Sequence, residues 1–108
     1  MRTIEEVRKM FEGDRFATEN GAVIEEIGEK SAKCSLVITD SHRNALGAVM
    51  GGTYFMLADF AFAVAANHEN MGCVSMHSDI SFLKAAFKKP RSGTWVFCFF
   101  RNSTSWRY

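Results

Sequence analysis

Residues 51–59 contain groups whose types and spacing suit chemistry at a carbonyl carbon. Gly51 and Gly52 stand at the start of a predicted helix, and Asp59 follows on the same helix. Two glycines at a helix start expose backbone N–H groups that have no intrahelical partner, and the helix dipole adds partial positive charge there. Such a helix start can polarise a carbonyl group and stabilise its oxyanion, and the missing Cβ atoms allow close approach of a substrate.

Asp59 is the only charged residue between positions 45 and 66. A charge in apolar surroundings is costly without partners, so we expect it to act as a base on water or as a nucleophile. The alternative is a buried structural acid that accepts hydrogen bonds. The helix rises about 10 Å between Gly52 and Asp59. That is too far for one helix to serve both ends of a single carbonyl, which favours an obligate oligomer or a split site.

Several polar residues outside this helix are weaker candidates. Asn44 lies in the polar loop before the helix and can orient a water or a carbonyl group, or it can form an Asx turn. Ser75, His77 and Ser81 share the polar face of an alternating segment. We expect them to face solvent or to line a pocket, because they form no convincing nucleophile triad. The three histidines lack the spacing of metal ligands, and we predict no metal site.

Composition limits the class of protein. A chain of 108 residues suits one domain, here 1–108. Apolar residues make up 47% and charged residues 23%, as in an ordinary globular protein rather than a disordered one. The net charge is +1, without a basic stripe, and this indicates no nucleic-acid partner.

Cysteine use and the N-terminus indicate the cytoplasm. Cys34, Cys73 and Cys98 are odd in number and widely spaced, so we expect buried free thiols. The polar N-terminus lacks the apolar core of a signal peptide. The stretch 45–66 is long enough to span a bilayer, but its glycines and its aspartate oppose insertion. We therefore expect no membrane partner and a helix buried inside a soluble protein.

The predicted elements occur in the order helix, two strands, long helix and at least two strands. Thr3 and Glu6 form a capping-box pattern at the first helix. The elements are a helix at 3–12, a hairpin within 16–39 whose turn is 28–30, a helix from 51 or 52 to 67, strands at 73–83 and 94–100, and a turn at 90–93. Strands and helices do not alternate, so we predict an α+β fold with an antiparallel sheet and one helix held against it.

A pattern of five positions resembles a known family. Asn44, Gly47, Gly51, Gly52 and Asp59 fall in the register of the hotdog-fold acyl-CoA thioesterases of the PaaI type, with Leu-Ala before the acid. The resemblance covers about residues 1–86. It implies a hotdog fold, in which an antiparallel sheet wraps around one long buried helix. It also implies hydrolysis of an acyl-CoA thioester, no cofactor beyond the coenzyme A of the substrate, and a homodimer or tetramer.

The resemblance assigns roles by position. Asp59 is the implied base or nucleophile, Gly51 and Gly52 supply the oxyanion amides, and Asn44 makes an orienting contact. In the family, the acid of one subunit meets the Gly-Gly helix start of the other. The implied substrate-binding positions are Gly47, Met50, His77 and Ser81.

Two departures from the family pattern keep an alternative open. Met50 stands where the family usually has histidine, and methionine cannot donate a hydrogen bond. The sequence after residue 86 no longer resembles the family, so we expect the last strands of the fold to be missing and the chain to be truncated or altered there. The alternative is a non-catalytic hotdog module that binds acyl-CoA or acts as a structural dimer.

Overall fold

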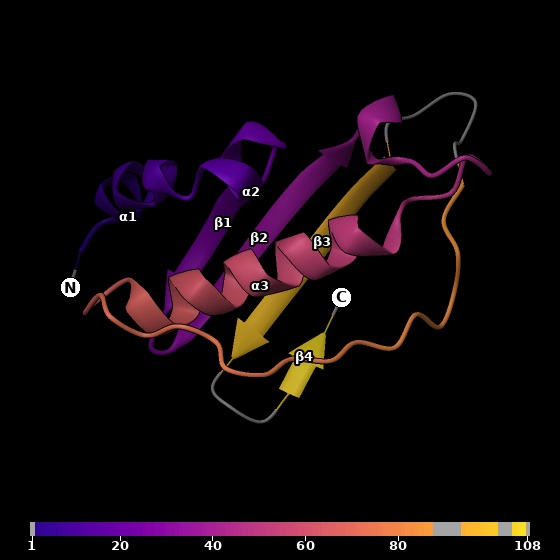
Figure 1. The fold of residues 1–108 in the computed structure, drawn as a ribbon. Helices are drawn as coiled ribbons and strands as arrows, with labels where there is room; N and C mark the ends of the chain where they lie inside the picture. Colours follow the sequence, from indigo (N-terminus) through magenta and orange to yellow (C-terminus); the bar gives the residue numbers. More distant parts are fainter. Residues whose placement is uncertain (1, 88–93, 102–104, 108) are drawn as a thin grey trace.

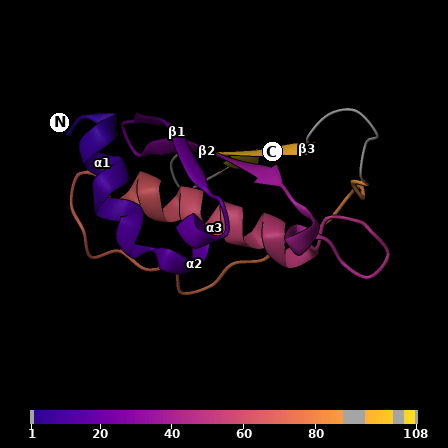
Figure 2. The same ribbon diagram turned by 90° about the horizontal axis from the view of Figure 1, so that it is seen from above.

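The fold is an antiparallel sheet with one long helix against one of its faces (Figure 1). The computed structural model describes residues 2–87, 94–101 and 105–107. The four strands are ordered β1-β2-β3-β4 and comprise Val23–Gly28, Ser31–Ile38, Thr94–Arg101 and Ser105–Arg107. The helix α3 (Gly51–Asn67) forms a second layer, as Figure 2 shows from above. The predicted long helix and the strand at 94–100 are confirmed.

The N-terminal segment folds into short helices beside the sheet. They are α1 (Ile4–Met10), the 3-10 helix η1 (Phe11–Gly13) and α2 (Arg15–Glu19). The capping box is present: the Glu6 N–H donates to Thr3 Oγ1 at 3.2 Å, and the Thr3 N–H donates to Glu6 Oε1 at 3.2 Å. These hydrogen bonds lower the pKa of Glu6. The prediction of a helix at 3–12 is thereby confirmed, whereas α2 had no separate prediction.

The predicted hairpin is confirmed as β1 and β2. Its tight turn requires a left-handed residue, and Lys30 has a φ of 49° there. The register shifts between Ile24 and Glu26, which marks a bulge in β1. Glu25 lies at this bulge and accepts a hydrogen bond from the hydroxyl of Ser35 on β2. This contact satisfies a buried serine that the alternating pattern alone would leave without a partner.

The core lies between α3 and the sheet. Leu57, Ala61 and Val64 of α3 are completely buried. Two edge-to-face aromatic pairs contribute to this core. The ring centroids of Phe60 and Phe11 are 6.0 Å apart, and those of Phe62 and Phe100 are 5.4 Å apart. Burial of this apolar face is the main term that holds the helix in place, since its capping residue Met50 makes no side-chain cap bond.

The cysteines differ from one another. Cys34 on β2 and Cys98 on β3 are direct partners in the sheet, and both are buried free thiols, as expected. Burial raises the pKa of Cys98 to about 12 and that of Cys34 further, so neither is a reactive thiolate. Cys73 is exposed, so the expectation of a buried thiol is wrong at that position.

The predicted strand at 73–83 is wrong. This segment is an extended loop that runs back alongside α3 (Figures 1 and 2). Of its alternating apolar side chains, Val74 and Met76 are exposed at 83% and 100%, and only Ile80 is half-buried. Alternation makes a segment able to pair, but a strand also needs backbone hydrogen bonds to a neighbouring strand. Residues 73–83 pair with neither outer strand of the sheet, β1 or β4, and lie alongside α3 instead. The loop makes one bridge near its end, between Ala48 and Phe87.

The remaining differences lie near the chain's ends. Residues 16–19, expected to begin the hairpin, belong to α2. β4 forms in a tail whose residues show no clear strand period. The predicted turn at 90–93 lies outside the described residues. In the part of the chain that the structure describes, no helix is long and apolar enough to cross a membrane.

The buried face of α3 predicts a contrast between two leucines. Leu57→Ala removes a completely buried side chain and should lower the free energy of unfolding by about 2–5 kcal/mol. Leu83→Ala, at an exposed position, should change it by less than about 0.5 kcal/mol. Urea denaturation of both variants measures the difference. Equal losses would mean that residues 73–83 are packed in solution.

Candidate active site

The loop before α3 is built around a buried histidine. His42 belongs to the 3-10 turn η2 (Asp40–His42) and is 7% exposed. Its Nδ1 accepts the backbone N–H of Thr39 at 2.9 Å, and its Nε2 lies 2.7 Å from the carbonyl oxygen of Asn20. A neutral ring with its proton on Nε2 satisfies both contacts. His42 therefore joins the loop to the N-terminal helices and is a structural residue.

Asn44 organises the turn that follows. Its Oδ1 accepts the N–H groups of Leu46 at 3.0 Å and Ala48 at 3.1 Å, as in an Asx-type turn. The N–H of Gly47 returns to the Asn44 carbonyl at 2.9 Å, and Gly47 has a φ of +84° that favours glycine. The hydrogen bonds of the Asn44 Oδ1 atom are therefore those of the alternative prediction, an Asx turn. Only its Nδ2 group is left for the predicted orienting contact.

The start of α3 presents the two glycines in different surroundings. Gly51 is half-buried beneath the ring of Phe82, since a Cβ built there would lie 2.9 Å from Phe82 Cζ. Gly52 is exposed, and a Cβ there would lie 2.9 Å from Cε of Met50. The N–H groups of a first helical turn precede the hydrogen-bond ladder. Gly52 is therefore the more accessible of the two predicted oxyanion donors.

Asp59 is exposed in the single chain, so the expectation of a buried charge is wrong. The reason is the setting of α3, which turns its buried side chains toward the sheet and Asp59 away from it. Ser75 Oγ donates to Asp59 Oδ1 at 3.3 Å. This places Ser75 beside the carboxylate, a role that its position on an apparently solvent-facing segment did not suggest.

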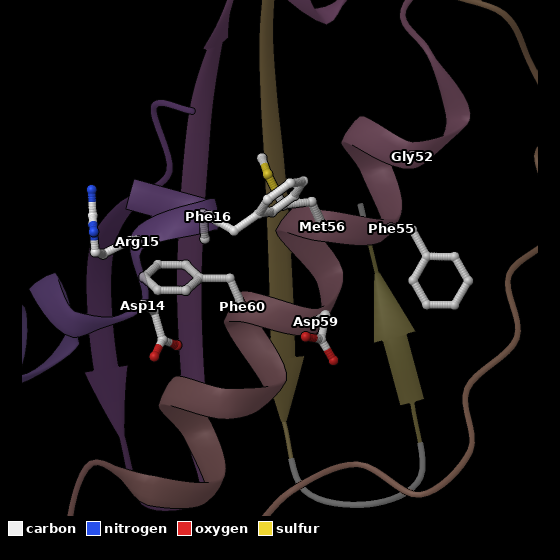
Figure 3. Close-up of a pocket in the computed structure, with 9 residues that line it drawn as sticks. Asp14, Arg15, Phe16, Gly52, Phe55, Met56, Asp59 and Phe60 are labelled. Atoms are coloured by element: carbon white, nitrogen blue, oxygen red, sulfur yellow. The ribbon is translucent and has the colours of Figure 1, made fainter. Parts of the chain in front are cut away.

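Two cavities meet at Asp59. The first, of about 480 Å³, contains Gly52 and Asp59 among its walls (Figure 3). Its apolar lining comes from Phe16, Ala17, Phe55, Met56 and Phe60, and its other polar members are Asp14 and Arg15. The second, of about 710 Å³, lies on the other side of α3 and includes Asp59, Ser75, His77 and Ser81. Asp59 and Phe55 line both.

The predicted residues are thus gathered in part. Gly52 and Asp59 share one cavity, and His77 and Ser81 line the other with Asp59. Asn44, Gly47, Met50 and Gly51 line neither cavity, and belong to the loop before α3 and to the start of that helix. No group of three metal-ligating side chains occurs among the described residues.

Asp14 and Phe16 are members of the first cavity that sequence reasoning missed. Both come from the start of α2, far from α3 along the chain. A sequence pattern shows which residues lie together within one element. It therefore could not predict that residues of α2 form part of the wall of a cavity beside α3. The one clue was an aspartate directly before a short helical segment, which is read as a cap rather than as a pocket residue.

Comparisons with known proteins find relatives of this chain in sequence and in fold. No protein-family profile matches the chain. The chain is 34% identical over 79 residues to an Archaeoglobus fulgidus protein that bears the name "Putative esterase", covering 73% of this chain and 51% of that protein. It is 33% identical over 78 residues to the acyl-coenzyme A thioesterase PaaI of Escherichia coli, covering 72% and 56%. The chain spans about half the length of these curated relatives.

Solved structures share the fold. The E. coli PaaI protein superposes with a TM-score of 0.74 at 30% identity, covering 84% of this chain and 63% of that one. Mouse thioesterase superfamily member 2 superposes with a TM-score of 0.64 at 18% identity, covering 95% and 89%. Sheet, long helix and glycine-led helix start together define a protein of the hotdog fold. Within that fold, the chain is similar to the PaaI-type thioesterases, one of which it matches in both sequence and structure.

Because a Cβ at Gly52 would meet only the flexible end of the Met50 side chain, we predict that Gly52 tolerates a methyl group. Gly52→Ala should change the free energy of unfolding by less than about 1 kcal/mol, because the flexible end of Met50 can move and alanine favours a helix. Gly47→Ala should cost about 1 kcal/mol or more, because its φ of +84° strains any side chain. Urea denaturation compares the two. A larger loss for Gly52→Ala would mean that Met50 is fixed against Gly52.

Proposed function

We propose that this protein hydrolyses an acyl-CoA or similar thioester to a free acid and a thiol. The observation that carries the proposal is that Gly52 and Asp59 are both exposed on the wall of one open cavity, where each can meet a substrate. The helix start attracts negative charge, and the carboxylate can accept a proton. In the assembly proposed below, each of them acts with the other group of a partner subunit. The named relatives supply independent support, since one is called an acyl-coenzyme A thioesterase.

The proposed reaction begins with the carbonyl oxygen at the start of α3. The N–H of Gly52, assisted by that of Gly51, polarises the carbonyl and stabilises the oxyanion. Asp59 takes a proton from water as the water oxygen bonds to the carbonyl carbon. When the oxyanion collapses, the carbon–sulfur bond breaks and the departing thiolate receives the proton from Asp59. Ser75, hydrogen-bonded to Asp59, orients the carboxylate for this transfer.

The walls of the cavities suit the two ends of such a substrate. Phe16, Met56 and Phe60 offer an apolar surface for an acyl group. The second cavity adds polar side chains, including His77 and Ser81, for which we propose contacts with the substrate. Coenzyme A enters this scheme as part of the substrate, and no separate cofactor is required. We propose a cytoplasmic location, where acyl-CoA is available and free thiols persist.

Replacement of Asp59 tests the chemistry. Asp59→Asn keeps the shape of the side chain but cannot accept a proton, so thiol release should fall by about 100-fold or more. The assay follows free thiol from a panel of acyl-CoA thioesters. Glu69→Gln is the control, an exposed carboxylate beyond the end of α3 that lines neither cavity. Equal rates for wild type and Asp59→Asn would contradict the proposal, and tight acyl-CoA binding without turnover would establish the binding-module alternative.

We further propose a homodimer or tetramer in which Asp59 of one subunit works with the helix start of another. The rise of about 10 Å between Gly52 and Asp59 along one helix supports this division. An inactive oxyanion variant, Gly52→Pro, and Asp59→Asn should each lose activity alone. If the site is shared, co-refolding them in equal amounts should restore about a quarter of wild-type activity, because half of the dimers are mixed and each holds one intact site.

Light scattering during gel filtration gives the number of chains in the assembly and supports the same test. A single chain with full activity would overturn the shared site. So would an oligomer in which the mixed variants recover nothing although each variant is folded by circular dichroism. In that case the carboxylate and the amides of one chain would act together.

A further inference from the structure

A second carboxylate shares the cavity of Gly52 and Asp59. Asp14, from the start of α2, lines the same space as Asp59 from α3. Figure 3 shows the two carboxylates on either side of Phe60, while the side chain of Arg15 extends away from them. The two acids come from different helices, so the fold and not the local sequence brings them together.

The carboxylate of Asp14 is not engaged in capping its own helix. An aspartate at this position usually accepts an N–H from the first turn. Here Asp14 makes no side-chain cap bond: its backbone carbonyl accepts the N–H and the hydroxyl of Thr18 at 3.0 Å each, and its backbone N–H donates to the Phe11 carbonyl at 3.0 Å. The side chain therefore contributes its charge to the cavity without a structural duty in α2.

The charged groups around Asp14 leave Asp59 as its main electrostatic neighbour. Among the described residues that line the cavity, the other charged ones are Asp59 and Arg15. Arg15 is bound in an ion pair with Glu19 at 2.8 Å on its own helix. Partial burial in the cavity wall, and next to it the negative charge of Asp59, raise the pKa of Asp14. The pair thus interacts across the space that the substrate would enter.

Resting on the proposed function, we propose that Asp14 is a positioning residue of the thioesterase site, whose negative charge faces Asp59 across the cavity and favours its uptake of the water proton. Two like charges in one cavity repel each other, and uptake of the water proton by Asp59 relieves that repulsion. The ionised Asp14 therefore favours the proton transfer. On its other side Asp59 faces the second cavity, whose other charged or titratable members are His77 and Asp79, 3.5 Å apart.

The pH dependence of kcat/KM tests this role. With the acyl-CoA that wild type hydrolyses fastest, Asp14→Asn should lower the plateau by roughly threefold and move the acid limb to lower pH by about half a unit. Asp14→Glu retains the charge and should restore the wild-type limb. Glu12→Gln, an exposed carboxylate that lines neither cavity, should leave the profile unchanged. An acid limb that stays in place in an active Asp14→Asn enzyme would overturn the proposal.

A second measurement does not depend on activity and so separates this inference from the proposed function. Carbon-13 NMR of the carboxyl groups follows the titration of Asp14 in the full chain, in wild type and in Asp59→Asn. Removal of the Asp59 charge should lower the pKa of Asp14, since that charge contributes to raising it. An unchanged Asp14 titration would refute the pairing even if thioesters are hydrolysed. A lowered value in a protein that hydrolyses no thioester would retain the pairing and refute only the proposed function.

Discussion

The burial of one face of α3 is the constraint on which the rest of the structure depends. Leu57, Ala61 and Val64 are completely buried against the sheet. At about 100° per residue they fall within roughly 60° of one another on the helix surface. On the same count Gly52 and Asp59 lie about 20° apart, and they lie about 140° and 160° from Leu57, on the opposite side of the helix. Packing of the core therefore fixes the rotation of α3, and this rotation places both site residues in one outward stripe, about two turns apart.

Local sequence signals correctly predicted the elements whose structure is determined by interactions between residues close together in the sequence. Thr3 and Glu6 specify a helix start through contacts three residues apart. The alternation of β2 and the glycine before its turn specify a hairpin, because the partner strand is adjacent in sequence. The glycine pair and Asp59 were predicted for the same reason, since their spacing along one helix decides their relative position. Structure that depends on residues nearby along the chain can therefore be predicted from the sequence.

The predictions that failed depended on distant parts of the chain. Residues 73–83 have the alternation of a strand, but the fold places them alongside α3, and the strand that pairs with β2 is β3, from later in the chain. Asp59 was expected to be enclosed because its helix is apolar all round, yet enclosure depends on what packs over its outer face. Asp14 was missed because the cavity wall it forms belongs to another helix. Each of these features depends on contacts between elements that are far apart in the sequence, and the periodicity of a single segment does not determine such contacts.

In the proposed reaction, the charges of the site all favour movement of negative charge in one direction. Before the reaction the charge is on Asp59, in a cavity that already holds the carboxylate of Asp14. As Asp59 takes a proton, negative charge appears on the carbonyl oxygen at a helix N-terminus, where the dipole and free N–H groups stabilise it. Charge thus leaves a site of repulsion and arrives at a site of attraction. Interactions that change in this way favour the transition state over the bound substrate, which is the requirement for catalysis. This holds whether the helix start belongs to the same chain or to a partner, because in either case the oxyanion forms at the positive end of a helix.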